Sequence, residues 1–276
     1  GNQIVSEEEK RKILTELVQK MELEYEDEEE FIQNLIGEIT LVKSEYMPIE
    51  HYYSTTCGEA EFRQLYQSYQ ERIQSEGKLD FDDMLVYTYE LLKERSDICR
   101  QWQEKFQYIL IDEFQDINHI QYEIVRMLSG DRKNLFVVGD DDQSIYRFRG
   151  ARPEIMLGFT KDYPEAEVIL LNVNYRSSRE IVEGSLRMIA NNTKRYDKEI
   201  RSEQPYVAPI CIHELKSPAE EAQDIRKQIQ IYHDRGIPYR EMAVIFRTNM
   251  DPRRTVNALM EYNLPFRMRD HLPNCY

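Results

Sequence analysis

Two adjacent carboxylates, Asp112 and Glu113, directly follow the apolar run 107–111 and are the first candidates for chemistry in this sequence. A short run of this kind predicts a buried strand, and ligands of parallel sheets bind at the carboxyl ends of the strands. There, one carboxylate could hold Mg²⁺ and the next could orient and deprotonate an attacking water molecule. Taken alone, the pattern also fits an acidic cap at the start of a helix.

A second candidate group occupies residues 139–151, which follow the apolar run 135–138. Its side-chain amide, Gln143, stands where it could sense a phosphate group. Aromatic and arginine side chains then alternate, as a platform for single-stranded nucleic acid requires, because bases stack on rings and guanidinium groups bind phosphates. These side chains are Tyr146, Arg147, Phe148, Arg149 and Arg152. The alternative is a loop after a strand, with the aromatic residues in the core.

A third group, residues 171–178, contains Tyr175 and Arg176 after the apolar run 168–171. An arginine near a transferring phosphoryl group offsets the charge of the transition state, and a tyrosine could stack on a base. An arginine that caps the edge of a sheet is the alternative.

A parallel sheet would bring these groups together, and the hydrophobic pattern predicts an α/β fold because strands and helices alternate. The predicted strands of the first sheet are 107–111, 135–138 and 168–171, with helices at 118–128 and from Ser178 onward. The alternation restarts near residue 206, with predicted strands at 210–212, 243–246 and 265–267 and helices at 218–234 and 252–262.

The chain before this sheet is predicted to be helical. Apolar spacing and caps predict helices at 6–23, 28–46, 58–76, 80–95 and 97–105. The polar, proline-bearing segment 192–209 is a plausible hinge. We therefore predict three parts, which are a helical part at 1–78, an α/β part at 79–200 and the start of a second α/β part at 201–276.

The charge of the chain is strongly acidic and uneven. The net charge of the 276 residues is −15, and residues 1–60 alone hold 15 acidic and 5 basic residues. Bulk charge would therefore not bind nucleic acid, so a nucleic-acid site must be a local groove. The acidic run 24–30 is either a partner-binding tail or, more simply, a solvated turn or helix start.

The cellular setting predicted from composition is the cytoplasm. Four cysteines are present and none forms a CxxC pair. Half of the opening 30 residues are charged, unlike a signal peptide, and no apolar run is long enough to span a membrane.

Taken together, the motifs closely resemble those of superfamily 1 DNA helicases of the UvrD/Rep/PcrA family. Residues 112–116 match the DExxD form of Walker B, and residues 139–151 and 174–178 match the third and fourth motifs. Residues 79–85 and 243–249 fit two further motifs in the family order. The resemblance implies parts of two RecA-like P-loop NTPase motor domains, together with an all-helical insertion subdomain at 1–78.

The resemblance also implies an ATP-dependent helicase that uses ATP and Mg²⁺ and acts on single-stranded DNA and duplex junctions. The roles of the matching family positions imply that Asp112 binds Mg²⁺ with ATP and that Glu113 is the general base. Gln143 couples the γ-phosphate to DNA, Arg176 is an arginine finger and Tyr175 stacks on the adenine. The implied DNA-binding residues are Phe81, Tyr146, Phe148, Arg149, Arg247 and Asn249.

The sequence departs from the family pattern in two respects. Phe148 stands where these helicases usually carry Trp, which should preserve stacking in a weaker form. In addition, no stretch matches GxxxxGK[ST], the loop whose backbone N–H groups and lysine cradle phosphates. The simplest interpretation is an internal portion of a helicase, whose Walker A motif lies upstream and whose last motifs lie downstream.

Two expectations follow for the chain by itself. As a helicase portion it should hydrolyse ATP negligibly, bind DNA weakly and expose a raw sheet edge that favours self-association. The alternative is a degenerate relative that binds DNA or protein without hydrolysis.

Overall fold

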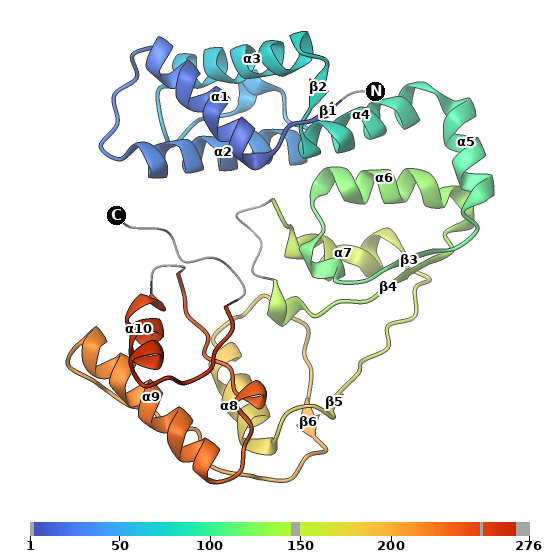
Figure 1. Ribbon diagram of the computed structural model, residues 1–276. Helices are drawn as coiled ribbons and strands as arrows, with labels where there is room; N and C mark the ends of the chain where they lie inside the picture. The colour runs from blue at the N-terminus through green and yellow to red at the C-terminus, as the bar shows by residue number, and fades with distance from the viewer. Residues whose placement is uncertain (1–2, 145–149, 249–250, 269–276) are drawn as a thin grey trace. The chain divides into compact units, whose positions relative to one another are not determined.

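The computed structural model describes residues 3–144, 150–248 and 251–268. The chain forms two compact units, residues 1–206 and residues 207–276 (Figure 1). The helices described in the first unit are α1 (Glu7–Lys20), α2 (Glu28–Ser44), α3 (Glu59–Ser75), α4 (Phe81–Glu94), α5 (Ser96–Lys105), α6 (His119–Ser129), α7 (Pro153–Asp162) and α8 (Arg179–Ile189). The strands described there are β1 (Gln3–Ile4), β2 (Lys78–Leu79), β3 (Ile109–Ile111), β4 (Leu135–Val137), β5 (Val173–Asn174) and β6 (Arg201–Ser202).

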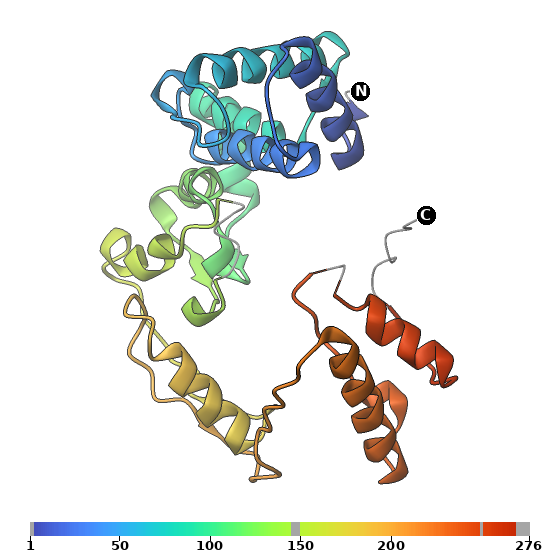
Figure 2. The ribbon, with the colours of Figure 1, turned by 90° about the vertical axis from the view of Figure 1, so that its left-hand side faces the viewer.

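Helices α1, α2 and α3 pack around one hydrophobic core, and both Figure 1 and Figure 2 show them side by side. The predicted starts of these helices are confirmed by their caps. The side chain of Ser6 accepts a hydrogen bond from the Glu9 amide, and Asp27 does the same for Glu30. The fully buried side chains of this core include Leu14, Leu35, Ile39, Phe62, Leu65 and Ile73.

A short parallel pair, β1 with β2, joins the start of the chain to the segment after α3. Gly77 ends α3 with a φ of 65°, a conformation that glycine adopts without steric cost. Asp80 then caps α4, with its side chain accepting from the Asp83 amide at 2.8 Å. The predicted helices 80–95 and 97–105 are thus confirmed as α4 and α5.

Strands β3 and β4 are the centre of the α/β part and pair in parallel, as the sequence predicts. Ile109 is opposite Leu135 and Ile111 is opposite Val137. The helix between them, α6, packs against α4 and α5 through buried Leu92, Cys99, Ile120 and Ile124. Consequently the residues after β3 and those after β4 emerge at the same edge of the sheet.

The predicted strand at 168–171 is wrong. The structure instead has the two-residue strand β5 at Val173–Asn174, paired in parallel with β6. Leu171 is 83% exposed and Ile169 is 69% exposed. A strand needs a hydrogen-bonded neighbour, and none of the described residues pairs with 168–171.

The second unit is described as helical. It contains α9 (Pro218–Asp234) and α10 (Arg253–Glu261), which pack together and confirm the helices predicted at 218–234 and 252–262. The predicted strands 210–212, 243–246 and 265–267 are wrong for the same reason as 168–171, since the structure describes these residues without strand pairing. Ile212 and Ile245 are more than nine-tenths exposed. Among the described residues, no helix is long and apolar enough to cross a membrane.

Candidate active site

The two carboxylates predicted after β3 lie exposed at the carboxyl end of the strand. The Phe114 amide donates to the Val138 carbonyl at 2.8 Å, which fixes the turn after β3 against the end of β4. Glu113 adopts a left-handed conformation, with φ 51° and ψ 40°. This left-handed backbone conformation costs roughly 1–2 kcal/mol for a residue with a Cβ atom, so the surroundings of Glu113 must stabilise it.

Gln115 is the residue that holds this turn, and it was given no role in the sequence analysis. Its side chain is buried, its Nε2 donates to Glu113 Oε2 at 2.7 Å, and its Oε1 accepts from the Asp140 amide at 3.0 Å. A Cβ atom at Gly139 would stand 2.7 Å from this Oε1, so glycine is required for the approach. An uncharged polar side chain at a buried position indicates such a role, but the burial of Gln115 is seen in the structure and not in the sequence.

Gln143 joins the same group from the turn after β4. This turn, η4 (Asp141–Gln143), brings Gln143 Nε2 to donate to Asp140 Oδ2 at 2.8 Å. Glu113 is therefore connected to Gln143 through Gln115 and Asp140. The structure thus connects Glu113 of the first sequence motif with Gln143 of the second.

Tyr175 and Arg176 form a second, separate group after β5. Both side chains are exposed, and Asn174 Oδ1 accepts from the backbone amides of Arg176 at 3.0 Å and Ser177 at 2.8 Å. Residues 173–177 line a shallow hollow of about 530 Å³. No hydrogen bond or ion pair joins Tyr175 or Arg176 to Asp112, all three being described residues.

Phe81 is the first residue of α4 and is 62% exposed. An exposed ring at a helix start is available for stacking on a base. Arg247 is exposed in the second unit. Four of the predicted DNA-binding residues, Tyr146, Phe148, Arg149 and Asn249, lie outside the described residues.

A cluster of buried charges surrounds Asp80, the residue before Phe81, and sequence analysis did not detect it. Lys43 Nζ is 2.6 Å from Asp80 Oδ2 and 2.7 Å from Asp83 Oδ1, and its side chain is 2% exposed. Lys10 Nζ lies 3.5 Å from Asp80, and the Tyr69 hydroxyl donates to Asp80 at 3.0 Å. Burial alone would raise the pKa of Asp80, but the two ammonium groups outweigh it and hold that pKa below its usual range.

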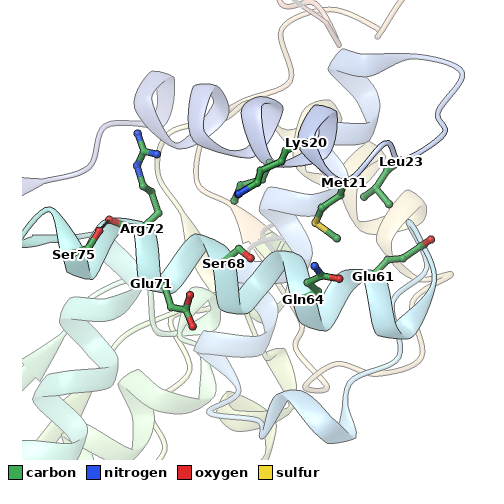
Figure 3. Close-up of a pocket in the computed structure, with 10 residues that line it drawn as sticks. Lys20, Met21, Leu23, Glu61, Gln64, Ser68, Glu71, Arg72 and Ser75 are labelled. Carbon is green, nitrogen blue, oxygen red and sulfur yellow. Dashed lines mark hydrogen bonds between the residues drawn. The ribbon is translucent and has the colours of Figure 1, made fainter.

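A hollow of about 580 Å³ lies between α1 and α3. Figure 3 shows Met21 and Leu23 above Gln64 and Glu61 on α3. Its lining mixes apolar groups with both signs of charge and contains none of the predicted site residues, so it points to no particular ligand.

The donors at the β3 edge fit the cofactors implied by the sequence. Mg²⁺ prefers oxygen ligands and usually binds one or two carboxylates together with substrate phosphates. Asp112 offers an exposed carboxylate of this kind. The described residues contain no cluster of three or more His, Cys, Asp or Glu side chains arranged around a metal.

Comparison with known proteins identifies the family. Residues 1–164 match the UvrD/REP helicase N-terminal domain, and residues 169–272 match the UvrD-like helicase C-terminal domain. The family implies a RecA-like α/β fold, and the described residues form three small parallel sheets with flanking helices.

Three relatives illustrate the similarity. "Putative ATP-dependent DNA helicase YjcD" of Bacillus subtilis (strain 168) is 36% identical over 87% of this chain and 32% of its own length. "ATP-dependent DNA helicase PcrA" of Staphylococcus aureus (strain Mu50) is 38% identical over 74% of this chain and 28% of its own. "Probable DNA helicase II homolog" of Mycoplasma capricolum is 33% identical over 96% of this chain and 37% of its own.

The chain spans about a third of the length of these relatives. The two regions that match the domain models contain all of the sequence motifs described above. The chain therefore belongs to the UvrD/REP helicase family.

Proposed function

We propose that this chain is part of an ATP-dependent DNA helicase, which translocates on single-stranded DNA and unwinds duplex junctions as ATP hydrolysis closes two motor domains. The observation that carries the proposal is the connection of Glu113 to Gln143 through Gln115 and Asp140. A general base and a phosphate sensor must act on the same phosphoryl group, and this connection fixes one relative to the other.

In this proposal Asp112 holds Mg²⁺ with ATP, and the metal neutralises phosphate charge when bound. Glu113 takes the proton of the attacking water, while Gln143 couples binding of the γ-phosphate to the DNA site. Arg176 stabilises the charge of the transition state and Tyr175 stacks on the adenine. The Walker A loop is absent from the sequence, so another segment must cradle the phosphates.

Single-stranded DNA would be bound by rings and by cationic or polar side chains near them. The residues proposed for this role are Phe81, Tyr146, Phe148, Arg149, Arg247 and Asn249. We assign residues 1–78 to a helical insertion subdomain, 79–200 to the second half of the first motor domain, and 201–276 to the start of the second. Such an enzyme would work on DNA in the cytoplasm.

The test is ATP hydrolysis with and without single-stranded DNA, in this chain and in the chain joined to a P-loop segment of a relative. The chain alone should be inactive, and the joined protein should show DNA-stimulated hydrolysis that Glu113→Gln abolishes. Glu104→Gln, on exposed surface of α5, is the matched control and should leave activity unchanged. DNA binding without any hydrolysis in the joined protein would instead favour a non-hydrolysing binding module.

A further inference from the structure

One segment, residues 195–204, contacts both groups of predicted ATP-site residues, and we call it the strap. Its first contact is Lys198, whose Nζ lies 2.5 Å from Asp140, 2.6 Å from Asp141 and 3.0 Å from Asp142. The Lys198 side chain is 11% exposed. A single ammonium group thus lies close to three consecutive carboxylates and offsets part of their mutual repulsion.

The strap is fixed at this end by more than one side chain. Arg195 forms an ion pair with Asp142 at 2.7 Å, and the Tyr196 amide donates to Asp141 Oδ2 at 2.8 Å. Burial alone would lower the pKa of Lys198, but its hydrogen bonds to the three carboxylates raise that pKa above its usual range. The positive charge of Lys198 is therefore maintained across the neutral pH range.

The other end of the strap holds the turn that carries Tyr175 and Arg176. Ser202 Oγ donates to the Ser177 carbonyl at 2.6 Å, and Gln204 Nε2 donates to the Tyr175 carbonyl at 2.7 Å. Ser202 belongs to β6, which pairs with β5. Both carbonyl acceptors flank Arg176 in the chain.

The carboxylate of Asp140 connects the strap to the catalytic group directly. Its Oδ1 binds Lys198 and its Oδ2 accepts from Gln143, while its backbone amide donates to Gln115. A change in the position of Lys198 must therefore change the setting of the Gln143 amide.

We propose that Lys198 is a positioning residue, which anchors the strap so that the Gln143 turn and the Tyr175–Ser177 turn are held at a fixed relation to each other. The inference rests on the proposed function, since Gln143 and Arg176 act on the same phosphoryl group there. The strap would transmit the presence of the γ-phosphate at Gln143 to the residues that precede the second unit.

The structural part of the test uses this chain and Lys198→Met. Hydrogen–deuterium exchange should rise about tenfold in both 139–144 and 173–177, because both segments lose their common anchor. Lys194→Met is the matched control. Lys194 is an exposed lysine just before the strap, and it donates a hydrogen bond to Asn192 through its backbone amide. Lys198→Arg, which keeps the charge, should restore most of the protection. Exchange that rises at 139–144 alone would overturn the strap, and unchanged exchange would overturn the role of Lys198.

The functional part uses the helicase that contains the whole set of family motifs. Lys198→Met should leave the KM for ATP unchanged and lower the stimulation of kcat by single-stranded DNA about tenfold, with partial rescue by Lys198→Arg. Partial unfolding would lower hydrolysis equally with and without DNA and would leave the stimulation ratio unchanged. A changed KM for ATP with intact DNA stimulation would contradict the proposal. A helicase whose hydrolysis survives Glu113→Gln would refute the proposed function, while the exchange experiment would still decide on the strap.

Discussion

Replacing Lys43 with methionine tests whether the buried charges around Asp80 stabilise the fold. Methionine keeps most of the side-chain volume and removes the ammonium group, which lies 2.6 Å from Asp80 and 2.7 Å from Asp83. Asp80 would then keep Lys10, at 3.5 Å, while Asp83 would lose the lysine it pairs with in the described structure. Removing one partner of a buried pair costs roughly 3–5 kcal/mol, and the remaining lysine places the loss near the lower limit, at about 3 kcal/mol.

The assay is denaturant unfolding of this chain, followed by far-ultraviolet circular dichroism and by the fluorescence of Trp102, the single tryptophan. Lys12→Met is the control, because Lys12 lies exposed on α1. It should change the free energy of unfolding by less than about 0.5 kcal/mol. A loss for Lys43→Met as small as that of the control would refute the reasoning, since it would mean that water already solvates the carboxylates.

Acidity provides an independent check on the same variant. In the native chain the pKa of Asp80 is lowered, so its contribution to stability is present above pH ~4 and is lost as the pH falls. Burial raises the pKa of Asp83, and Lys43 opposes that rise. Without Lys43 the pKa of Asp83 rises further, and a raised folded pKa favours the folded state at low pH. The deficit of the variant should therefore shrink as the pH falls toward the ordinary carboxyl pKa of about 4.

Two further substitutions separate structure from binding. Gln115→Leu leaves the groups that Gln115 bonds without a partner, and thermal unfolding should show a loss of about 1–3 kcal/mol; an unchanged melting temperature would mean that the bridge is not formed. Phe81→Ala should weaken binding of a fluorescent single-stranded oligonucleotide by roughly 1–3 kcal/mol in an anisotropy titration. Met84→Ala, on the same helix and also exposed, should bind as the parent does, and equal effects of the two would argue against stacking.

The helices could be predicted well because their signals are local. Ser6, Asp27 and Asp80 cap the three helices that follow them, and Gly77 ends the third helix of the chain. The apolar runs at 168–171 and 243–246 carry equally strong local signals for strands, yet they are exposed without strand pairing in the described structure. Strand formation depends on a partner that is distant in the sequence, so the apolar run alone does not determine whether a strand forms.

The candidate site was predictable to the extent that sheet geometry determines it. Glu113 and Gln143 follow neighbouring parallel strands, so their proximity could be expected. Gln115 and Lys198 could not be identified, because their roles depend on burial and on contacts that span 25 to 58 residues along the chain. Tyr175 and Arg176 remain predictions for the ATP site, connected to it through the strap.

Two opposing forces act between copies of this chain: attraction between exposed apolar runs and repulsion between net charges. Leu171, Ile212 and Ile245 are each more than four-fifths exposed, and such side chains attract a second copy through the hydrophobic effect. A net charge of −15 keeps copies apart at low ionic strength, where the Debye length is about 30 Å in 0.01 M salt. In 1 M salt that length falls to about 3 Å, so we expect the attraction to outweigh the repulsion and the chain to associate. We therefore predict that the ionic strength of the buffer sets the balance between single molecules and assemblies, which light scattering across a salt series would measure.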